Sequence, residues 1–223
     1  MFDWLWQFDV WGVRALNVDA RQSWLDPIML VITNTGLGQI QLAPFLAIVI
    51  NKKLNQKFHW LTWLVVSVIV GILGWRENHL ILHLASFAVL AIAFYRIKPE
   101  LASKVWGSVI LGFLIHGILR QLFHRPRPSN FAWSNPLEPY FQDSFPSGHA
   151  FSTAAIAFCL MMNLSGSGVR VLAGVWLLLV MASRVYVGVH FPTDVLAGAG
   201  IGLMAASIVQ MLTKGPVQRT IEV

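Results

Sequence analysis

In this 223-residue chain, polar and ionisable side chains between Arg120 and Asp194 lie at the ends of apolar segments, in three short blocks. The blocks are Arg120 with Arg127-Pro128, then Pro146-Ser147-Gly148-His149, and finally Ser183-Arg184 with His190 and Asp194. Charged groups at membrane depth are costly, so they are candidates for function. Three arginines and two histidines that converge on one side would form a phosphate pocket with an imidazole placed to attack the phosphorus.

The third block has the residues for a nucleophile. Pro192 suits the first position of a helix, which places Asp194 in the first turn, near His190. A carboxylate hydrogen-bonded to one imidazole nitrogen fixes the tautomer and leaves the other nitrogen basic. We therefore predict that His190 is a nucleophile oriented by Asp194. The alternative is a helix-capping aspartate beside an interfacial histidine.

The second block could bind an anion and supply an acid. Ser147 and Gly148 precede a helical apolar run, so their backbone N–H groups lack partners within the helix. Glycine allows an anion to approach these amides closely, and the helix dipole favours negative charge there. His149, in the first turn, could protonate a leaving oxygen. A purely structural helix cap is the alternative.

Arginines of the blocks have the shape to bind phosphate, because their forked donors match phosphate oxygens and they stay charged at any relevant pH. We expect this role for Arg120, Arg127 and Arg184. Arg125, in the same loop, is interpreted instead as a membrane-flanking cation that extends toward lipid headgroups.

Together the three blocks resemble the motifs of the type 2 phosphatidic acid phosphatase (PAP2) superfamily, membrane lipid phosphatases related to vanadium haloperoxidases. Those motifs read Lys, six residues, Arg-Pro; then Pro-Ser-Gly-His; then Ser-Arg, five residues, His, three residues, Asp. This sequence has the second and third in full and departs from the first at Arg120, where the family usually has Lys. The resemblance covers residues 120–212, so the N-terminal half carries no motif.

The resemblance implies hydrolysis of a lipid phosphate ester or anhydride through a phosphohistidine, without a metal or other cofactor. It assigns the attack to His190, its orientation to Asp194 and protonation of the leaving oxygen to His149. Phosphate binding would fall to Arg120, Arg127, Ser147, Gly148 and Arg184. Undecaprenyl diphosphate is the first expected substrate, and phosphatidylglycerophosphate or phosphatidic acid are alternatives. A lipid phosphotransferase would need the same residues.

The elements that must position these residues are predicted to be membrane helices. The chain is 56% hydrophobic and 12% charged, with a mean hydropathy of +0.63, which is too apolar for a soluble domain of this size. Apolar stretches close to the length of a membrane span recur. They cover residues 27–50, 58–75, 80–95, 101–123, 149–164, 169–181 and 195–212.

We therefore predict one all-α transmembrane bundle over residues 1–223, similar to the PAP2 and haloperoxidase fold. It would have a six-helix core and one additional helix in the N-terminal half, or six crossings if one early segment is re-entrant. Residues 120–212 would form the catalytic core. Residues 1–26 should lie in the membrane interface, since their aromatic side chains alternate with Asp3, Asp9 and Arg14.

Loop charges predict the orientation, because short loops rich in Lys and Arg stay cytoplasmic. On the seven-helix count such loops hold Lys52, Lys53, Lys57, Arg96, Lys98, Lys104, Arg170, Lys214 and Arg219. The N-terminus, the loop 124–145 and the turn 184–194 then face outward. We predict a multi-pass protein of a bacterial plasma (inner) membrane with an extracytoplasmic site, whose lipid substrate enters sideways between helices.

Other functional classes fit less well. The net charge is +6, but the cations do not form an exposed stripe, so nucleic acid is not an expected partner. A transporter or channel would carry polar residues deep inside several helices, whereas here they gather at helix ends. The expected partners are the bilayer and a lipid phosphate, and nothing in the sequence indicates an oligomeric state.

Two further features have structural interpretations. Gly198 and Gly202 lie one turn apart in the last apolar stretch, a spacing that predicts close packing of helix backbones. Cys159 is the single cysteine, so an intrachain disulfide is excluded and a core or lipid-facing position is expected.

Overall fold

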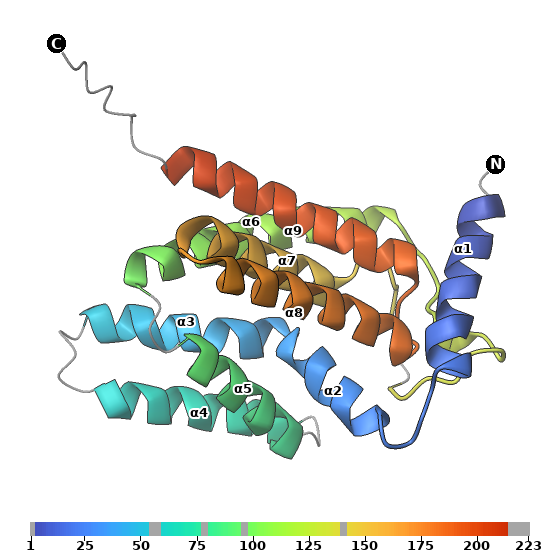
Figure 1. Ribbon diagram of the computed structural model, residues 1–223, viewed down its shortest axis with the longest axis horizontal. Helices are drawn as coiled ribbons and strands as arrows, with labels where there is room; N and C mark the ends of the chain where they lie inside the picture. Colours follow the sequence, from blue (N-terminus) through green and yellow to red (C-terminus); the bar gives the residue numbers. More distant parts are fainter. Residues whose placement is uncertain (1–2, 54–58, 77–79, 95–97, 139–141, 214–223) are drawn as a thin grey trace, which may run out of the picture.

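The computed structural model describes residues 3–53, 59–76, 80–94, 98–138 and 142–213, which contain helices and loops but no β-strand (Figure 1). The α-helices are α1 (Asp3–Val13), α2 (Asp26–Thr35), α3 (Gly38–Lys53), α4 (His59–Arg76), α5 (Leu80–Phe94), α6 (Pro99–Leu122), α7 (Gly148–Asn163), α8 (Ser167–Tyr186) and α9 (Pro192–Thr213). A π-helical segment (Arg14–Asp19) continues α1, and a short 3-10 helix (Pro128–Asn130) lies in the loop after α6. The predicted all-α class is confirmed.

Helix α7 lies at the centre of a bundle with α6, α8 and α9, while α2 to α5 pack along one side of it (Figure 1). Helix α1 stands across the end of this bundle where α8 ends and α9 begins. The last residues of α9 lie at the opposite end. The two ends of the bundle therefore differ in the elements that they present.

Close contact between α7 and α9 depends on two glycines of α9. A Cβ atom at Gly202 would fall on the carbonyl oxygen of Phe151, and one at Gly198 would fall on that of Ser147. Side chains at these positions would push the two backbones apart. The predicted packing role of this glycine pair is confirmed.

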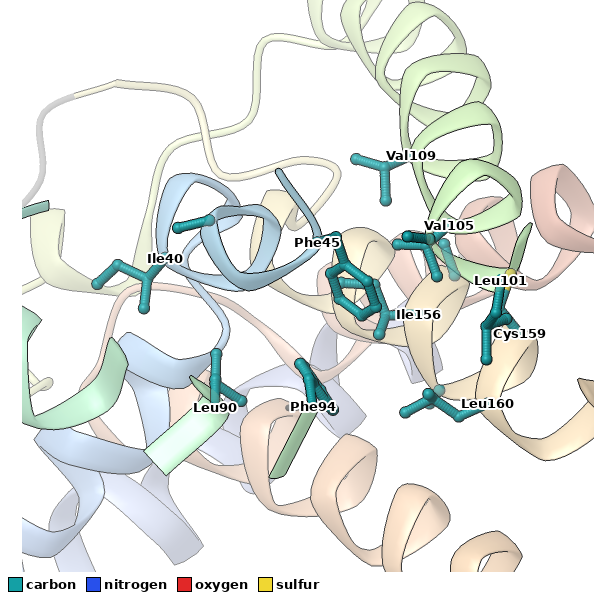
Figure 2. Close-up of a cluster of buried hydrophobic side chains, with 14 of the residues drawn as sticks. Ile40, Phe45, Leu90, Phe94, Leu101, Val105, Val109, Ile156, Cys159 and Leu160 are labelled. Atoms are coloured by element: carbon teal, nitrogen blue, oxygen red, sulfur yellow. The ribbon is translucent and has the colours of Figure 1, made fainter. Parts of the chain in front are cut away.

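A hydrophobic cluster joins the N-terminal helices to the helices that carry the motifs. Figure 2 shows Phe45 of α3 and Phe94 of α5 beside Ile156 of α7. The rings of Phe45 and Phe94 lie 4.9 Å apart. Cys159 is buried in the same cluster, as expected, with its Sγ 3.4 Å from the Ser108 hydroxyl. The N-terminal half thus supports the helices of the site through a shared core.

Three helices in the described ranges are long and apolar enough to cross a membrane: α6, α8 and α9. Their outer faces expose large apolar side chains such as Phe113, Leu178 and Met211. Exposed apolar surface on this scale suits contact with lipid rather than with water. The chain is therefore a membrane protein.

The prediction of one continuous helix over residues 27–50 is wrong, because the chain breaks between α2 and α3. Asn34 and Thr35 turn their side chains back to donate hydrogen bonds to the carbonyl oxygens of Leu30 and Ile32. The Gly36 amide then bonds to the Thr33 carbonyl in a tight turn. Short polar side chains offer the backbone an alternative to continued helix at this point.

Two cations of the orientation argument, Lys52 and Lys104, lie at the end of the bundle opposite α1. Two other loop cations, Arg125 and Arg127, lie at the α1 end. Lys52 at the end of α3 pairs with Glu100 at the start of α6, at 2.8 Å. Lys104 of α6 donates to the Asn163 side chain at the end of α7, at 2.7 Å. Of the other cations in the orientation argument, Lys57, Arg96, Lys214 and Arg219 lie outside the described residues.

Candidate active site

Three segments meet beside α1: the loop after α6, the start of α7 and the turn between α8 and α9. The Ser147 amide donates to the Asp194 carbonyl oxygen at 3.0 Å, which ties the start of α7 to the start of α9. The His190 amide lies 3.3 Å from the Arg184 carbonyl oxygen, which closes the turn after α8. The second and third sequence blocks are therefore neighbours in space.

The side chain of His190 is buried, with 3% of the residue exposed. Arg127 Nη1 lies 3.2 Å from His190 Nε2. Because a guanidinium has only donors, this contact selects the tautomer with a lone pair on Nε2 and the proton on Nδ1. Asp194 Oδ2 lies 3.8 Å from Nδ1, an ion-pair distance longer than a hydrogen bond. This arrangement makes Nε2 the basic nitrogen.

Arg127 is held by backbone carbonyl groups from two segments. Its Nε donates to Gln142 O at 2.7 Å and its Nη2 to Asp143 O at 3.0 Å. Its Nη1 also donates, at 2.8 Å, to the carbonyl oxygen of Val189, the residue before His190. A buried guanidinium fixed in this way keeps its orientation relative to the imidazole.

Arg184 reaches from the last turn of α8 to the break between α2 and α3. Its Nη1 donates to Thr33 Oγ1 at 2.7 Å, and the residue is buried. The sequence did not identify Thr33 as a site residue, because it lies in an apolar stretch without a motif. The polar run Thr33-Asn34-Thr35 before Gly36 was the available signal.

His149, half-buried in the first turn of α7, lies within electrostatic range of Arg184, His190 and Arg127. The α2–α3 break forms part of its surroundings, since a Cβ atom at Gly36 would lie 3.2 Å from His149 Cδ2. Both histidines and both buried arginines of the prediction therefore belong to one neighbourhood.

Ser147 caps α7, and Gly148 is its first residue. The Ser147 hydroxyl accepts a hydrogen bond from the Ala150 amide at 3.5 Å, so in this structure the side chain completes a helix cap. His116 of α6 contacts the Pro146 carbonyl oxygen through Nε2 at 3.0 Å. His116 thereby supports the loop that leads into the cap, a role that the sequence blocks did not indicate.

Arg120 lies at the edge of this group. Its Nη2 donates to Gln142 Oε1 at 2.8 Å, and the side chain is partly exposed. Its charge acts on His190 more weakly than those of Arg184 and Arg127. Gln142 links the two arginines of the first block, because its carbonyl oxygen binds Arg127.

The interpretation of Arg125 as a cation that extends to lipid headgroups is wrong. Its side chain is 24% exposed and pairs with Asp194 and with Asp9 of α1. Its Cζ lies 4.2 Å from the centre of the Phe191 ring. Two buried carboxylates at one place need a compensating charge, and Arg125 supplies it.

Positive charge and burial both act on His190. Burial lowers the pKa of His190 well below its usual value of 6.5, and the charges of Arg184 and Arg127 lower this pKa further. An interaction with the Ser144 backbone offsets part of the decrease. The imidazole is thus held neutral, the state that a nitrogen nucleophile requires.

An apolar groove of about 350 Å³ lies between α5, α7 and α8. The Trp176 indole lines it and donates to Thr35 Oγ1, at the α2–α3 break, at 3.0 Å. Its lining comprises Thr35, Val89, Leu90, Phe94, Leu160, Leu164, Val169, Leu172, Ala173 and Trp176.

Known proteins are similar to the part of this chain that carries the three sequence blocks. Residues 101–215 match the model of the PAP2 superfamily. Phosphatidylglycerophosphatase B of Bacillus subtilis is 33% identical over 159 residues, which are 65% of this chain and 73% of that protein. An undecaprenyl-diphosphatase of Sulfolobus acidocaldarius is 38% identical over 117 residues, or 50% of this chain and 53% of that protein. The chain thus spans about half the length of this second relative.

The fold also has a counterpart among solved structures. The crystal structure of Aquifex aeolicus LpxE superposes with a TM-score of 0.64, covering 91% of this chain and 94% of that chain. The two sequences are 22% identical. This similarity concerns the arrangement of the helices.

Proposed function

Because this chain belongs to the PAP2 superfamily, we propose that it is a membrane lipid phosphatase that works through a phosphohistidine at His190. The observation that carries this proposal is the pair of contacts on the imidazole. Arg127 faces Nε2 at 3.2 Å, and Asp194 lies 3.8 Å from Nδ1. An imidazole with its proton directed to a carboxylate and its lone pair beside a phosphate-binding cation suits attack on phosphorus.

The reaction has two steps. His190 Nε2 attacks the phosphorus, the bond from phosphorus to the lipid-side oxygen breaks, and His149 protonates that oxygen. Water then attacks the phosphohistidine, gives its proton to His149 and releases inorganic phosphate. His190 and His149 return to their starting states, so no other group is consumed.

The charge of the transferred phosphoryl group is balanced by the surrounding donors. Arg127 and Arg184 would bind its oxygens, with Arg120 at the edge of the site. The Ser147 hydroxyl and the Gly148 amide would complete the set, since the start of α7 presents N–H groups without helical partners. Phosphoryl transfer depends mainly on such positioning and electrostatic stabilisation.

Undecaprenyl diphosphate is the first proposed substrate. Lys52 and Lys104 lie at the end of the bundle opposite the site, which supports a site outside the cytoplasm of a plasma (inner) membrane. The loop cations at the site end, Arg125 and Arg127, have partners within the site. Hydrolysis there would recycle a carrier lipid. Phosphatidylglycerophosphate is the second candidate, and the similarity to phosphatidylglycerophosphatase B favours it specifically.

The apolar groove between α5, α7 and α8 would hold the lipid tail. Val169, Ala173 and Trp176 line it from α8, and Arg184 follows eight residues after Trp176 on the same helical face. A tail in this groove would therefore extend from the phosphate site into the bilayer.

Phosphate release tests the proposal. Purified protein in detergent should release inorganic phosphate from undecaprenyl diphosphate with EDTA present, and parallel reactions with phosphatidylglycerophosphate and phosphatidic acid rank the substrates. His190→Ala should lower kcat roughly a thousandfold or more, because it removes the attacking atom.

His124→Ala is the matched control, since this exposed histidine lies in the same region and pairs with Asp143. It should keep wild-type turnover. Turnover by a folded His190→Ala variant would refute the nucleophile, and transfer of phosphate to an added lipid alcohol would identify a phosphotransferase.

A further inference from the structure

The N-terminal helix carries one buried carboxylate. In α1, Trp4 and Trp11 are mostly exposed, whereas Asp9 is 1% exposed. Asp9 Oδ1 accepts from the Thr193 amide at 2.9 Å, and Oδ2 accepts from the Thr193 hydroxyl at 2.6 Å. Asp9 therefore caps the start of α9 from another helix, where backbone N–H groups and the helix dipole favour a negative charge.

Arg125 connects this cap to the catalytic carboxylate. Its Nη1 donates to Asp194 Oδ1 and to Thr193 Oγ1, each at 2.7 Å, while its Nη2 donates to Asp9 Oδ2. The guanidinium also lies over the Phe191 ring. Phe191 and Thr193 flank the helix start between His190 and Asp194, so Arg125 contacts the segment that carries both residues.

These contacts determine which oxygen of Asp194 faces the imidazole. Oδ1 accepts from Arg125, and Oδ2 accepts from the Phe191 amide at 2.8 Å. Held on both sides, the fully buried carboxylate presents Oδ2 toward His190 Nδ1. Rotation of the carboxylate would require breaking a charge-assisted hydrogen bond.

We propose that Arg125, itself held by Asp9 of α1, is a positioning residue that orients Asp194 and through it His190. The inference rests on the proposed function, in which Asp194 acts by orienting the nucleophile. It makes α1 part of the catalytic apparatus, although no sequence motif lies in that helix.

Attachment of the N-terminal segment does not depend on this pair alone. Asn17 Nδ2 donates to the Tyr186 carbonyl oxygen at 2.7 Å. Arg21 pairs with Asp26 at 3.2 Å and donates to Asn135 O at 2.6 Å. These contacts hold the segment without Asp9 or Arg125, so a variant at Arg125 can be tested without losing every attachment. Arg21 provides a matched control, because it also attaches the segment but does not contact Asp194.

Steady-state kinetics test the proposal with the full-length protein in detergent. Arg125→Ala should lower kcat about 10- to 100-fold, as loss of a supporting hydrogen bond to a catalytic group does, and should leave KM within about threefold. Added guanidinium ion should restore part of the lost kcat. Arg21→Ala should keep wild-type kcat and KM. Unchanged kcat in Arg125→Ala, or a loss that guanidinium does not restore, would overturn the proposal.

Asp9→Asn retains the shape of the side chain and is the second variant, chosen in case Arg125→Ala does not fold. It should lower kcat severalfold with KM unchanged, and full activity would remove Asp9 from the proposal.

A spectroscopic readout separates this inference from the proposed function. ¹⁵N-imidazole spectra of His190 should show Nδ1 protonated in the wild type and in Arg21→Ala, and a mixture of tautomers in Arg125→Ala and Asp9→Asn. These spectra need no turnover. Absent phosphate release by the wild type refutes the function, whereas unchanged His190 signals in both variants refute the positioning role.

Discussion

At the residue scale, the four arginines near His190 differ in what their guanidinium groups contact. Arg125 pairs with two carboxylates, which neutralise its charge. Arg127 contacts backbone carbonyl oxygens and His190 Nε2, and Arg184 contacts the Thr33 hydroxyl. Arg120 likewise binds an amide oxygen. Loss of Arg125 would therefore act through Asp194, whereas Arg120, Arg127 and Arg184 are the arginines to which we assign phosphate binding.

A first prediction concerns Arg120, where the family motif usually has Lys. Arg120→Lys should keep KM within about threefold of wild type, because a cation at the edge of the site is retained. Arg120→Ala should raise KM roughly tenfold, the cost of losing one hydrogen bond to a charged group. Arg170→Ala, at an exposed position near the start of α8, serves as the control. Equal KM values for all three variants would remove Arg120 from the phosphate site.

A second prediction concerns the protonation of His190. In the unfolded chain this side chain takes up a proton near pH 6.5, whereas burial and the arginine charges lower its pKa in the folded chain. As far as His190 is concerned, the free energy of unfolding is therefore highest above pH 6.5. It decreases as the pH falls below that value. Nitrogen-15 spectra, assigned with His190→Ala, should show a neutral imidazole at pH 6.5.

Inorganic phosphate should raise this pKa, since an anion offsets the arginine charges. Half-protonation of His190 at or above pH 6.5 without phosphate would contradict the described environment.

At the element scale, the site is built from the ends of helices that must stay in register. The start of α7 and the start of α9 share the bond from the Ser147 amide to the Asp194 carbonyl. Their approach is permitted by Gly198 and Gly202, whose missing side chains leave room for the α7 backbone. The distance between the second and third blocks thus depends on residues that touch no substrate.

A third prediction follows for this helix pair. Gly202→Ala should destabilise the protein by about 1–3 kcal/mol, because the added Cβ meets the Phe151 carbonyl and neither backbone can yield cheaply. Gly200→Ala is the matched control, since nothing lies within 4 Å of its added Cβ. It should be neutral or stabilise by up to about 1 kcal/mol. Thermal unfolding in detergent compares the two variants. Equal midpoint temperatures would mean that the contact between α7 and α9 tolerates a methyl group.

At the scale of the whole molecule, the bundle has two unlike ends. Helix α1, with exposed Trp4 and Trp11, crosses the end that holds the site (Figure 1). Tryptophan favours the level of the lipid headgroups, so this end should lie at one membrane surface. The Lys52–Glu100 pair lies at the other end. A phosphate site at a membrane surface can meet water while the lipid tail stays in the bilayer.

A fourth prediction tests the orientation of the bundle. A cysteine at Asn130, an exposed residue on the site side, should react with an impermeant thiol reagent from outside the cell. A cysteine at Arg170 should react only after permeabilisation. The unmodified chain is a suitable background, because Cys159 is buried. The reverse labelling pattern would place the site in the cytoplasm.

The helix starts that carry the site residues could be predicted from the sequence alone. The spacing of His190, Pro192 and Asp194 predicts a helix start with a carboxylate near an imidazole, and the structure starts α9 at Pro192. Ser147-Gly148 likewise predicts the start of α7. Helix caps and i, i+4 relations depend on neighbours in the chain, so residue types and spacing are sufficient to identify them.

The contacts between residues far apart in the sequence could be known only from the tertiary structure. Arg125 and Asp9 are 116 positions apart, and Thr33 and Arg184 are 151 apart. The break between α2 and α3 lies in a stretch whose hydropathy predicts one helix, yet it brings Thr33 and Gly36 to the site. Such pairings depend on how whole helices pack, because a buried charge is satisfied by whichever element the fold places beside it.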